Sequence, residues 1–345
     1  MATSTQYVLD ALRSLRVPTR AAGLALGALM CTLAASGCIN GDYEEPGRIE
    51  PGPDARPPGD EPSDPSNPGD DPANPGDDPS NPGDDPSNPG GSAPPAENLP
   101  AVDGECPTLV DGSTTILGTS VDLTVGSEAG PVYFYWHATG TSASEVERAI
   151  PDATDRVKAS GGIVASFQST SGRGTNTGNG VWFTGDFDAA DQILACGIEQ
   201  GLVDTSRIHT AGYSAGGLQV GVMTLERRYL ASAISYSGGL FGLRRGDLDQ
   251  ADYVPAVVTA HGAAGVDTLV LDFAATSATF ANEIVGAGGL AIDCDDGGGH
   301  VSLTRLGIQG RALEFFDDHP YGTAPSPYAG GLPGAWPSFC TLVDE

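Results

Sequence analysis

Ser214, in Gly212-Tyr213-Ser214-Ala215-Gly216, is the side chain whose neighbours best suit it to act as a nucleophile. Residues 207–211 before it predict a short buried strand, and residues 217–228 after it predict a helix. A serine on such a strand-to-helix turn is held in a strained backbone conformation, and the flanking glycines leave room for the turn. The pattern alone is frequent in a chain with 49 glycines, so an ordinary Gly-rich turn is the alternative.

A serine hydroxyl is a weak nucleophile at neutral pH and needs a general base within hydrogen-bond reach. Of the five histidines, we predict His300 as this base, because it lies in a flexible Asp-Asp-Gly-Gly-Gly-His loop directly after a predicted strand. His319, which follows the last predicted helix, is the main alternative. We expect His137 to have a structural role.

The base must be held in one tautomer, normally by a carboxylate on its other ring nitrogen. Asp267 lies in the loop after the predicted strand 254–260, where a third member of such a set would be expected. Asp272, five residues later, is the alternative acid.

Reaction at a carbonyl also needs hydrogen-bond donors aimed at the oxygen that becomes negative. The Ala215 N–H is one expected donor, because it lies at a helix N-terminus, where negative charge is favoured. We expect the second from the loop after the predicted strand 131–136, with Thr139 or Ala138 as the donor. Trp182 could line the cleft or belong to the core.

The elements that must position these residues alternate along the chain. We predict strands over 114–118, 121–125, 131–136, 162–167, 207–211, 231–235, 254–260 and 290–293, and helices over 143–159, 189–202, 217–228, 273–285 and 303–316. Such alternation predicts an α/β fold with a mainly parallel central sheet and helices on both faces. Ligands bind such sheets beyond the carboxyl ends of the strands.

Several motifs extend this pattern over about residues 105–320: the order Ser…Asp…His, a His-x-x-Gly loop, Val203-Asp204-x-x-Arg207-Ile208 and a late Gly-Gly-His. In these the chain resembles the secreted α/β-hydrolases related to polyhydroxybutyrate depolymerases and feruloyl or acetylxylan esterases. The resemblance implies the α/β-hydrolase fold and acyl transfer from an ester to Ser214, followed by hydrolysis of the acyl-enzyme. The chain departs from the family in one respect, since Asp267 lies two residues later than the usual acid.

The N-terminal residues predict export. Residues 1–20 carry Arg13, Arg16 and Arg20, and residues 21–37 are almost wholly apolar or small, which is typical of a signal peptide rather than a membrane span. The run ends in Ala35-Ser36-Gly37-Cys38, which resembles a bacterial lipobox. We therefore expect a lipid anchor on Cys38 at the bacterial cell envelope; secretion after plain cleavage is the alternative.

Residues 38–100 predict a disordered linker between this signal and a folded domain over 101–345. Residues 41–100 contain 17 of the 27 prolines and carry fifteen acidic residues against two basic ones, with Asn-Pro-Gly-Asp-Asp-Pro repeated every seven residues from Asn67. Such a segment buries almost nothing and extends by charge repulsion, so we predict an acidic spacer.

The predicted domain has a net charge of −18 and a single lysine, Lys158, which argues against a nucleic-acid partner and for neutral substrates. Its cysteines, Cys106, Cys196, Cys294 and Cys340, predict two disulfides with three possible connectivities. Their spacing does not match a zinc site, and we expect no metal, no cofactor and a monomer.

The sequence thus predicts an exported serine ester hydrolase acting on neutral esters such as polyester oligomers or hydroxycinnamoyl and acetyl esters of polysaccharide. Two alternatives keep the same fold. One is a serine peptidase, and the other is a catalytically silent binding or adhesion lipoprotein.

Overall fold

A computed structural model describes residues 91–242, 248, 251–300 and 303–344 of the 345-residue chain. The predicted signal peptide, Cys38 and most of the predicted linker lie outside the described residues. Within the described residues, no helix is both long enough and apolar enough to cross a membrane.

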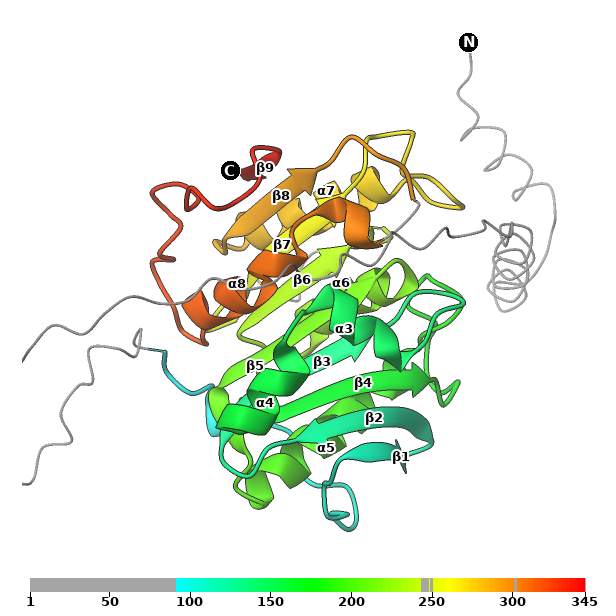
Figure 1. Cartoon of the computed structure of the whole chain (residues 1–345), viewed down its shortest axis with the longest axis vertical. Helices are drawn as coiled ribbons and strands as arrows, with labels where there is room; N and C mark the ends of the chain where they lie inside the picture. The colour runs from blue at the N-terminus through cyan, green and yellow to red at the C-terminus, as the bar shows by residue number, and fades with distance from the viewer. Residues whose placement is uncertain (1–90, 243–247, 249–250, 301–302, 345) are drawn as a thin grey trace, which may run out of the picture. The chain divides into compact units, whose positions relative to one another are not determined.

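A nine-stranded sheet forms the centre of the described domain, in the order β1-β2-β4-β3-β5-β6-β7-β8-β9 (Figure 1). Neighbours from β4 to β8 pair in parallel, whereas β1, β2 and β9 join the edges antiparallel. The predicted α/β class and mainly parallel sheet are therefore confirmed. The strands are β1 (Gly112–Ile116), β2 (Thr119–Val125), β3 (Gly130–Trp136), β4 (Ile163–Ser169), β5 (Val203–Tyr213), β6 (Ser232–Tyr236), β7 (Ala256–His261), β8 (Ala291–Asp295) and β9 (Cys340–Leu342).

Helices cover both faces of this sheet. One face packs against α3 (Val146–Ala149), α4 (Ala153–Ser160) and α8 (Ala312–Asp318), which lie in front of the sheet in Figure 1. The other face packs against α5 (Phe187–Glu199), α6 (Ala215–Glu226) and α7 (Phe273–Gly286). The central strands β3, β6 and β7 are buried throughout, because apolar side chains on both of their faces meet a helical layer.

Short 3₁₀ segments complete the described elements: η1 (Ala96–Asn98), η2 (Ala143–Glu145), η3 (Thr184–Asp186), η4 (Leu303–Leu306) and η5 (Gln309–Arg311). Two helices that the sequence predicts as continuous are interrupted in the structure, so these two predictions were wrong. The helix predicted over 143–159 breaks after α3, where Pro151 lacks an N–H and Asp152 has φ +66°. The helix predicted over 303–316 begins only at α8, after Gly307 with φ +68°.

Two disulfides resolve the cysteine pairing that the sequence left open. Cys106 pairs with Cys196 of α5, and this bond ties the segment before β1 to the helical layer. Cys294 of β8 pairs with Cys340 of β9, an edge strand that the sequence did not predict.

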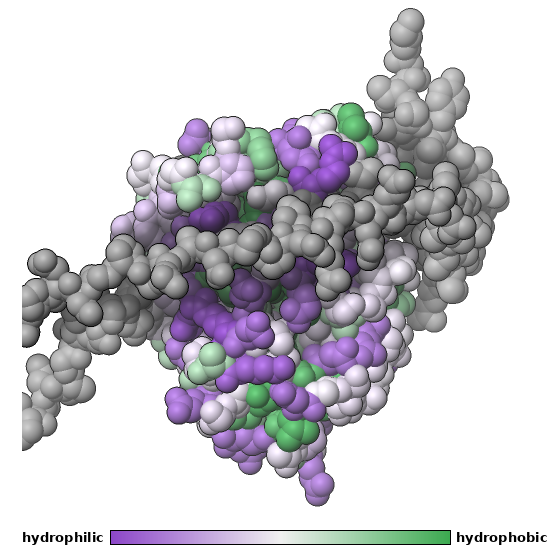
Figure 2. All heavy atoms as spheres, in the orientation of Figure 1, coloured by the Kyte–Doolittle hydropathy of each residue, from purple (hydrophilic) through white to green (hydrophobic). Residues whose placement is uncertain are grey.

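Figure 2 shows the face covered by α3, α4 and α8, where hydrophilic side chains surround smaller apolar patches.

Candidate active site

Ser214 lies between the end of β5 and the start of α6 and has φ +55°, a conformation that non-glycine residues rarely adopt. The turn requires the two glycines of the motif. A Cβ on Gly216 would collide with the Trp136 carbonyl at the end of β3, and a Cβ on Gly212 would collide with the Gly216 backbone. The strain at Ser214 is therefore stabilised by close backbone contacts that only glycine permits.

A continuous chain of hydrogen bonds links three residues from different strand ends. The Ser214 Oγ hydroxyl donates to His300 Nε2 over 2.9 Å, and His300 Nδ1–H donates to Asp267 Oδ1 over 2.7 Å. Because a carboxylate only accepts, the proton of the neutral ring lies on Nδ1, and Nε2 is left to accept from the serine. The structure thus brings together Ser214, His300 and Asp267 as the sequence predicted.

Aromatic rings hold the imidazole of His300 in this orientation. The ring stacks on Phe273 at a centroid distance of 4.3 Å and on Tyr213 at 5.4 Å. The side chain of His300 is 8% exposed and Ser214 is 7% exposed, so both are shielded but can be reached from solvent.

Asp267 is fully buried at the end of the turn that follows β7. Besides His300, its carboxylate accepts hydrogen bonds from the Gly262 N–H (2.9 Å) and the Ser237 hydroxyl (2.8 Å). Burial raises the pKa of this carboxyl, but the three hydrogen bonds outweigh burial and leave the pKa below its usual 3.8. Asp267 is therefore held as a carboxylate.

The two alternative residues from the sequence have other partners. Asp272 is the N-cap of α7, and its carboxylate accepts from the N–H groups of Ala275 (3.3 Å) and Gly265 (2.9 Å). His319 is fully buried after α8, where Nδ1 lies 2.8 Å from the Phe315 carbonyl and Nε2 lies 2.7 Å from Ser326 Oγ. Neither bonds to Ser214 or His300.

The loop after β3 offers one of its two candidate N–H donors. The Ala138 N–H donates to Glu145 Oε1 over 3.0 Å, so this donor is already used. No hydrogen bond of the described residues uses the Thr139 N–H or the Ala215 N–H. The loop is fixed by Glu145, which is 2% exposed and also accepts from Tyr135.

Trp182 is part of the core and supports the same loop. It is fully buried, its indole N–H donates to the His137 carbonyl over 3.0 Å, and its ring packs edge-on against the His137 ring. The His137 ring nitrogens lie 2.6 Å from the Ala138 carbonyl and 2.9 Å from the Gln168 carbonyl, which fits the structural role expected for this histidine.

Two residues that hold the site were missed at the sequence level. Ser237, at φ +41° directly after β6, bonds Asp267, and Glu145 fixes the loop that carries Thr139. Ser237 lies in Ser235-Tyr236-Ser237-Gly238, a serine at a predicted strand end, and this position was the signal that could have identified it.

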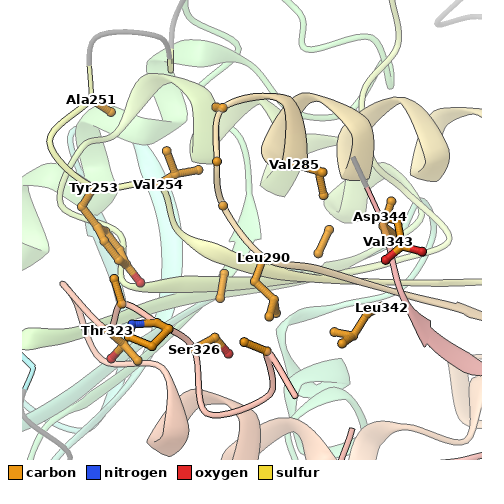
Figure 3. Close-up of a pocket in the computed structure, with 18 of the residues that line it drawn as sticks. Ala251, Tyr253, Val254, Val285, Leu290, Thr323, Ser326, Leu342, Val343 and Asp344 are labelled. Atoms are coloured by element: carbon orange, nitrogen blue, oxygen red, sulfur yellow. The ribbon is translucent and has the colours of Figure 1, made fainter. Parts of the chain in front are cut away.

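The described residues form no metal cluster, and they line a sizeable cavity away from Ser214. Within the described ranges, His, Cys, Asp and Glu side chains form no group of three or more suited to a metal ion. A cavity of about 710 Å³ lies at the amino ends of β7 and β8, where Leu290, Thr323 and Ser326 line it (Figure 3). The cavity therefore lies at the amino ends of the strands, whereas Ser214 lies at the carboxyl ends, directly after β5.

Solved structures resemble the described domain in fold. Native pOPH has a TM-score of 0.52 at 16% identity, covering 70% of this chain and 97% of that chain. Native sOPH has a TM-score of 0.51 at 14% identity, covering 71% and 97%. The chain has the α/β-hydrolase fold.

At these identities the likeness concerns the α/β-hydrolase fold alone, because one fold hosts many functions. An acetyl xylan esterase from Aspergillus awamori is also similar, with a TM-score of 0.43 at 15% identity, covering 59% of this chain and 97% of that chain. No family model and no curated protein matches the sequence.

Proposed function

We propose that this α/β-hydrolase is an exported serine hydrolase of neutral carboxylic esters, acting through an acyl-enzyme on Ser214. The observation that carries the proposal is the hydrogen-bonded chain from Ser214 through His300 to the buried carboxylate of Asp267. A nucleophile, a base and an acid that orients the base are the arrangement that acyl transfer from a serine requires.

In the proposed reaction, Ser214 Oγ attacks the ester carbonyl while His300 Nε2 takes the hydroxyl proton. Asp267 keeps the proton on Nδ1 and stabilises the imidazolium that forms. The imidazolium then protonates the leaving alcohol, which leaves the acyl group on Ser214. A water molecule, deprotonated by His300, then attacks the acyl-enzyme. The bond from the acyl group to Ser214 Oγ breaks, the imidazolium returns its proton to Ser214 Oγ, and the acid is released.

The negative oxygen of each tetrahedral intermediate would be stabilised by the N–H groups of Ala215 and Thr139. Ala215 is the first residue of α6, so its N–H has no acceptor within the helix. Thr139 follows Ala138, whose own N–H is occupied by Glu145. Preorganised donors of this kind are worth about 10²–10³ in turnover each.

Charge and exposed side chains support neutral, partly apolar esters as substrates. The residues from 101 onward carry a net charge of −18, which disfavours anionic substrates. Phe241, Val266 and Leu269 are each more than half exposed, and all three lie in loops after β6 or β7 at the carboxyl edge of the sheet. We therefore propose polyester oligomers or acyl esters of polysaccharide as substrates.

We further propose that a lipid on Cys38 anchors the enzyme through the acidic linker. Cys38→Ser should move the protein from the membrane fraction to the soluble fraction.

Hydrolysis of a short-chain neutral ester tests the proposed activity, and an ester library then sorts the acyl and alcohol groups. The wild type should turn over, His300→Ala should lose turnover, and His319→Ala should keep it if the protein folds. Loss in His319→Ala with a native circular dichroism spectrum, or activity retained in His300→Ala, would contradict the proposed base.

A further inference from the structure

A second histidine–carboxylate pair lies one residue from the turn that holds Asp267. His261 is the last residue of β7, and its side chain is only 5% exposed. Its Nε2 lies 3.0 Å from Asp293 Oδ1 on the neighbouring strand β8, and its Nδ1 lies 2.7 Å from the Gly262 carbonyl. The proposed reaction makes no use of this pair.

Both partners of the His261 ring are acceptors only, so both ring nitrogens must carry protons for both contacts to be attractive. In either neutral tautomer, one lone pair would face the Asp293 carboxylate or the Gly262 carbonyl. Burial lowers the pKa of His261, but the hydrogen bond to Asp293, with the smaller contribution of the Gly262 carbonyl, outweighs burial and raises the pKa above its usual 6.5. The pKa of Asp293 is lowered in return, as burial is outweighed by the bond from His261.

The His261 ring is connected to the Ser214 site through Gly262 and the loop of His300. Gly262 accepts from the ring with its carbonyl and donates its own N–H to Asp267 Oδ2. A Cβ on Gly262 would collide with the Gly298 carbonyl, and the Ala263 N–H donates to that carbonyl over 2.9 Å. A change in the Gly262 turn would therefore reach both Asp267 and the loop that carries His300.

We propose that His261 is a positioning residue for the Ser214 site. Its imidazolium, held between Asp293 and the Gly262 carbonyl, keeps the Gly262 turn in the geometry that orients Asp267. Loss of the His261 proton turns one of its two contacts repulsive, and turnover falls at alkaline pH as a result. The proposal rests on the proposed ester hydrolysis at Ser214 and adds that turnover has an upper pH limit set by His261.

Other charged groups lie around the His261 ring, and one of them, Asp295, offers a control variant for Asp293. Asp293 and Asp295 face it from β8, and Asp267 lies in the turn after β7. In the loop after β8, the Asp296 N–H donates to the His261 carbonyl over 3.0 Å, and Arg305 lies near Gly298. Of these carboxylates, only Asp293 bonds the His261 ring.

The test is the pH profile of kcat for a neutral ester in the wild type, Asp293→Asn and Asp295→Asn, with Ser214→Ala as the blank for alkaline hydrolysis. Asparagine at 293 keeps an acceptor but removes the charge that raises the His261 pKa. The alkaline limb should therefore move to lower pH by about one to three units, the range for an opposite charge in contact. Asp295→Asn removes an equal charge from the same strand, but Asp295 does not bond the ring. The alkaline limb of this variant should therefore move by less than half as much.

In Asp293→Asn the acid limb should move much less than the alkaline limb, and KM should stay within about threefold, since the effect is on the orientation of Asp267 rather than on binding. A merely structural pair would lower stability without moving the alkaline limb. An alkaline limb that is absent from the wild type, or unmoved in folded Asp293→Asn, would overturn the proposal.

A second measurement does not depend on turnover. In Ser214→Ala, proton NMR should show a low-field resonance from the His300 Nδ1–H that bonds Asp267, while carbon-labelled histidine reports the titration of His261. The low-field resonance should shift over the pH range in which His261 titrates. A resonance that stays constant over that range would reject the coupling, whether or not the wild type proves to hydrolyse esters.

Discussion

Two serine–histidine pairs of the described domain place a serine hydroxyl on the Nε2 of the histidine, and their surroundings differ. Ser214 bonds His300 Nε2 at the carboxyl ends of the parallel strands. Ser326 bonds His319 Nε2 and lines the cavity at the amino ends of β7 and β8. Both histidines carry Nδ1–H, because one faces Asp267 and the other faces the Phe315 carbonyl. A hydroxyl on a neutral imidazole is therefore not sufficient to identify a catalytic serine.

The third partner and the backbone distinguish the two pairs. A carboxylate stabilises the imidazolium that forms when the base takes a proton, whereas a carbonyl does so far less. His319 is fully buried, which lowers its pKa and disfavours that imidazolium further. Ser214 also precedes a helix whose first N–H has no intrahelical acceptor, while the Ser326 Oγ accepts from the Tyr328 N–H. We therefore propose a catalytic role for the first pair and a structural role for the second.

The largest expected difference between the pairs is in turnover. Ser214→Ala should lower kcat by about 10⁴–10⁶, because members of such a set act as a unit. Ser326→Ala should leave kcat within a few-fold of the wild type. Steady-state hydrolysis of a short-chain ester compares the two, and a large loss in folded Ser326→Ala would break the distinction.

The carboxylate should account for the next largest effect. Asp267→Asn should lower kcat by about 10³–10⁴, since the amide no longer favours the required tautomer or stabilises the imidazolium. Asp272→Asn is the matched control, because asparagine caps a helix about as well as aspartate. Comparable losses in both variants would mean that Asp272, and not Asp267 alone, acts with His300.

A smaller effect is expected from Ser237, which gives Asp267 one of its three hydrogen bonds. A hydrogen bond to a charged group contributes about 1.5–3 kcal/mol, so Ser237→Ala should lower kcat by about 10- to 150-fold. Ser232→Ala removes a buried hydroxyl at the other end of β6, where Ser232 contacts His209. The Ser232 variant should lose stability with kcat unchanged, and equal kcat in Ser237→Ala and the wild type would show that the third bond is dispensable.

The structural pair should reveal itself in stability rather than in rate. Burial lowers the pKa of His319 below its usual 6.5, so the unfolded chain binds a proton that the folded chain resists. Stability attributed to His319 is complete above pH 6.5 and is lost as the pH falls from 6.5 through the lower folded value. Urea unfolding at pH 7.5 and 5.5 should show this decrease, and it should be smaller in His319→Gln. An equal decrease in both proteins would assign it elsewhere, for example to His209, whose pKa burial also lowers.

Those parts of the fold and site that depend on local pattern were predictable. The alternation of strands and helices predicted the parallel sheet, and the three strand-end positions of Ser214, Asp267 and His300 follow from it, since parallel strands end at one edge. The separation of Asp267 from Asp272 was not decided by the sequence. It depends on the start of α7, where Asp272 is the N-cap and its carboxylate accepts from the Ala275 N–H instead of bonding His300.

Features that depend on tertiary contacts were not predictable in the same way. Glu145 looks like a surface acid in a charged segment, yet it is buried between Tyr135 and the Ala138 N–H. His261 resembles any strand-end histidine until the pairing of β7 with β8 brings the Asp293 carboxylate to its ring. Such pairings arise from strand register, which a single sequence without a partner strand does not specify.

Reaction with an active-site serine phosphonate, followed by mass spectrometric mapping of the adduct, tests the central distinction most directly. A phosphonate adduct forms only on a serine that a neighbouring base activates. We predict one adduct per chain on the peptide that contains Ser214, unchanged in Ser326→Ala and absent from Ser214→Ala. No adduct on the wild type, or an adduct on Ser326, would contradict the account.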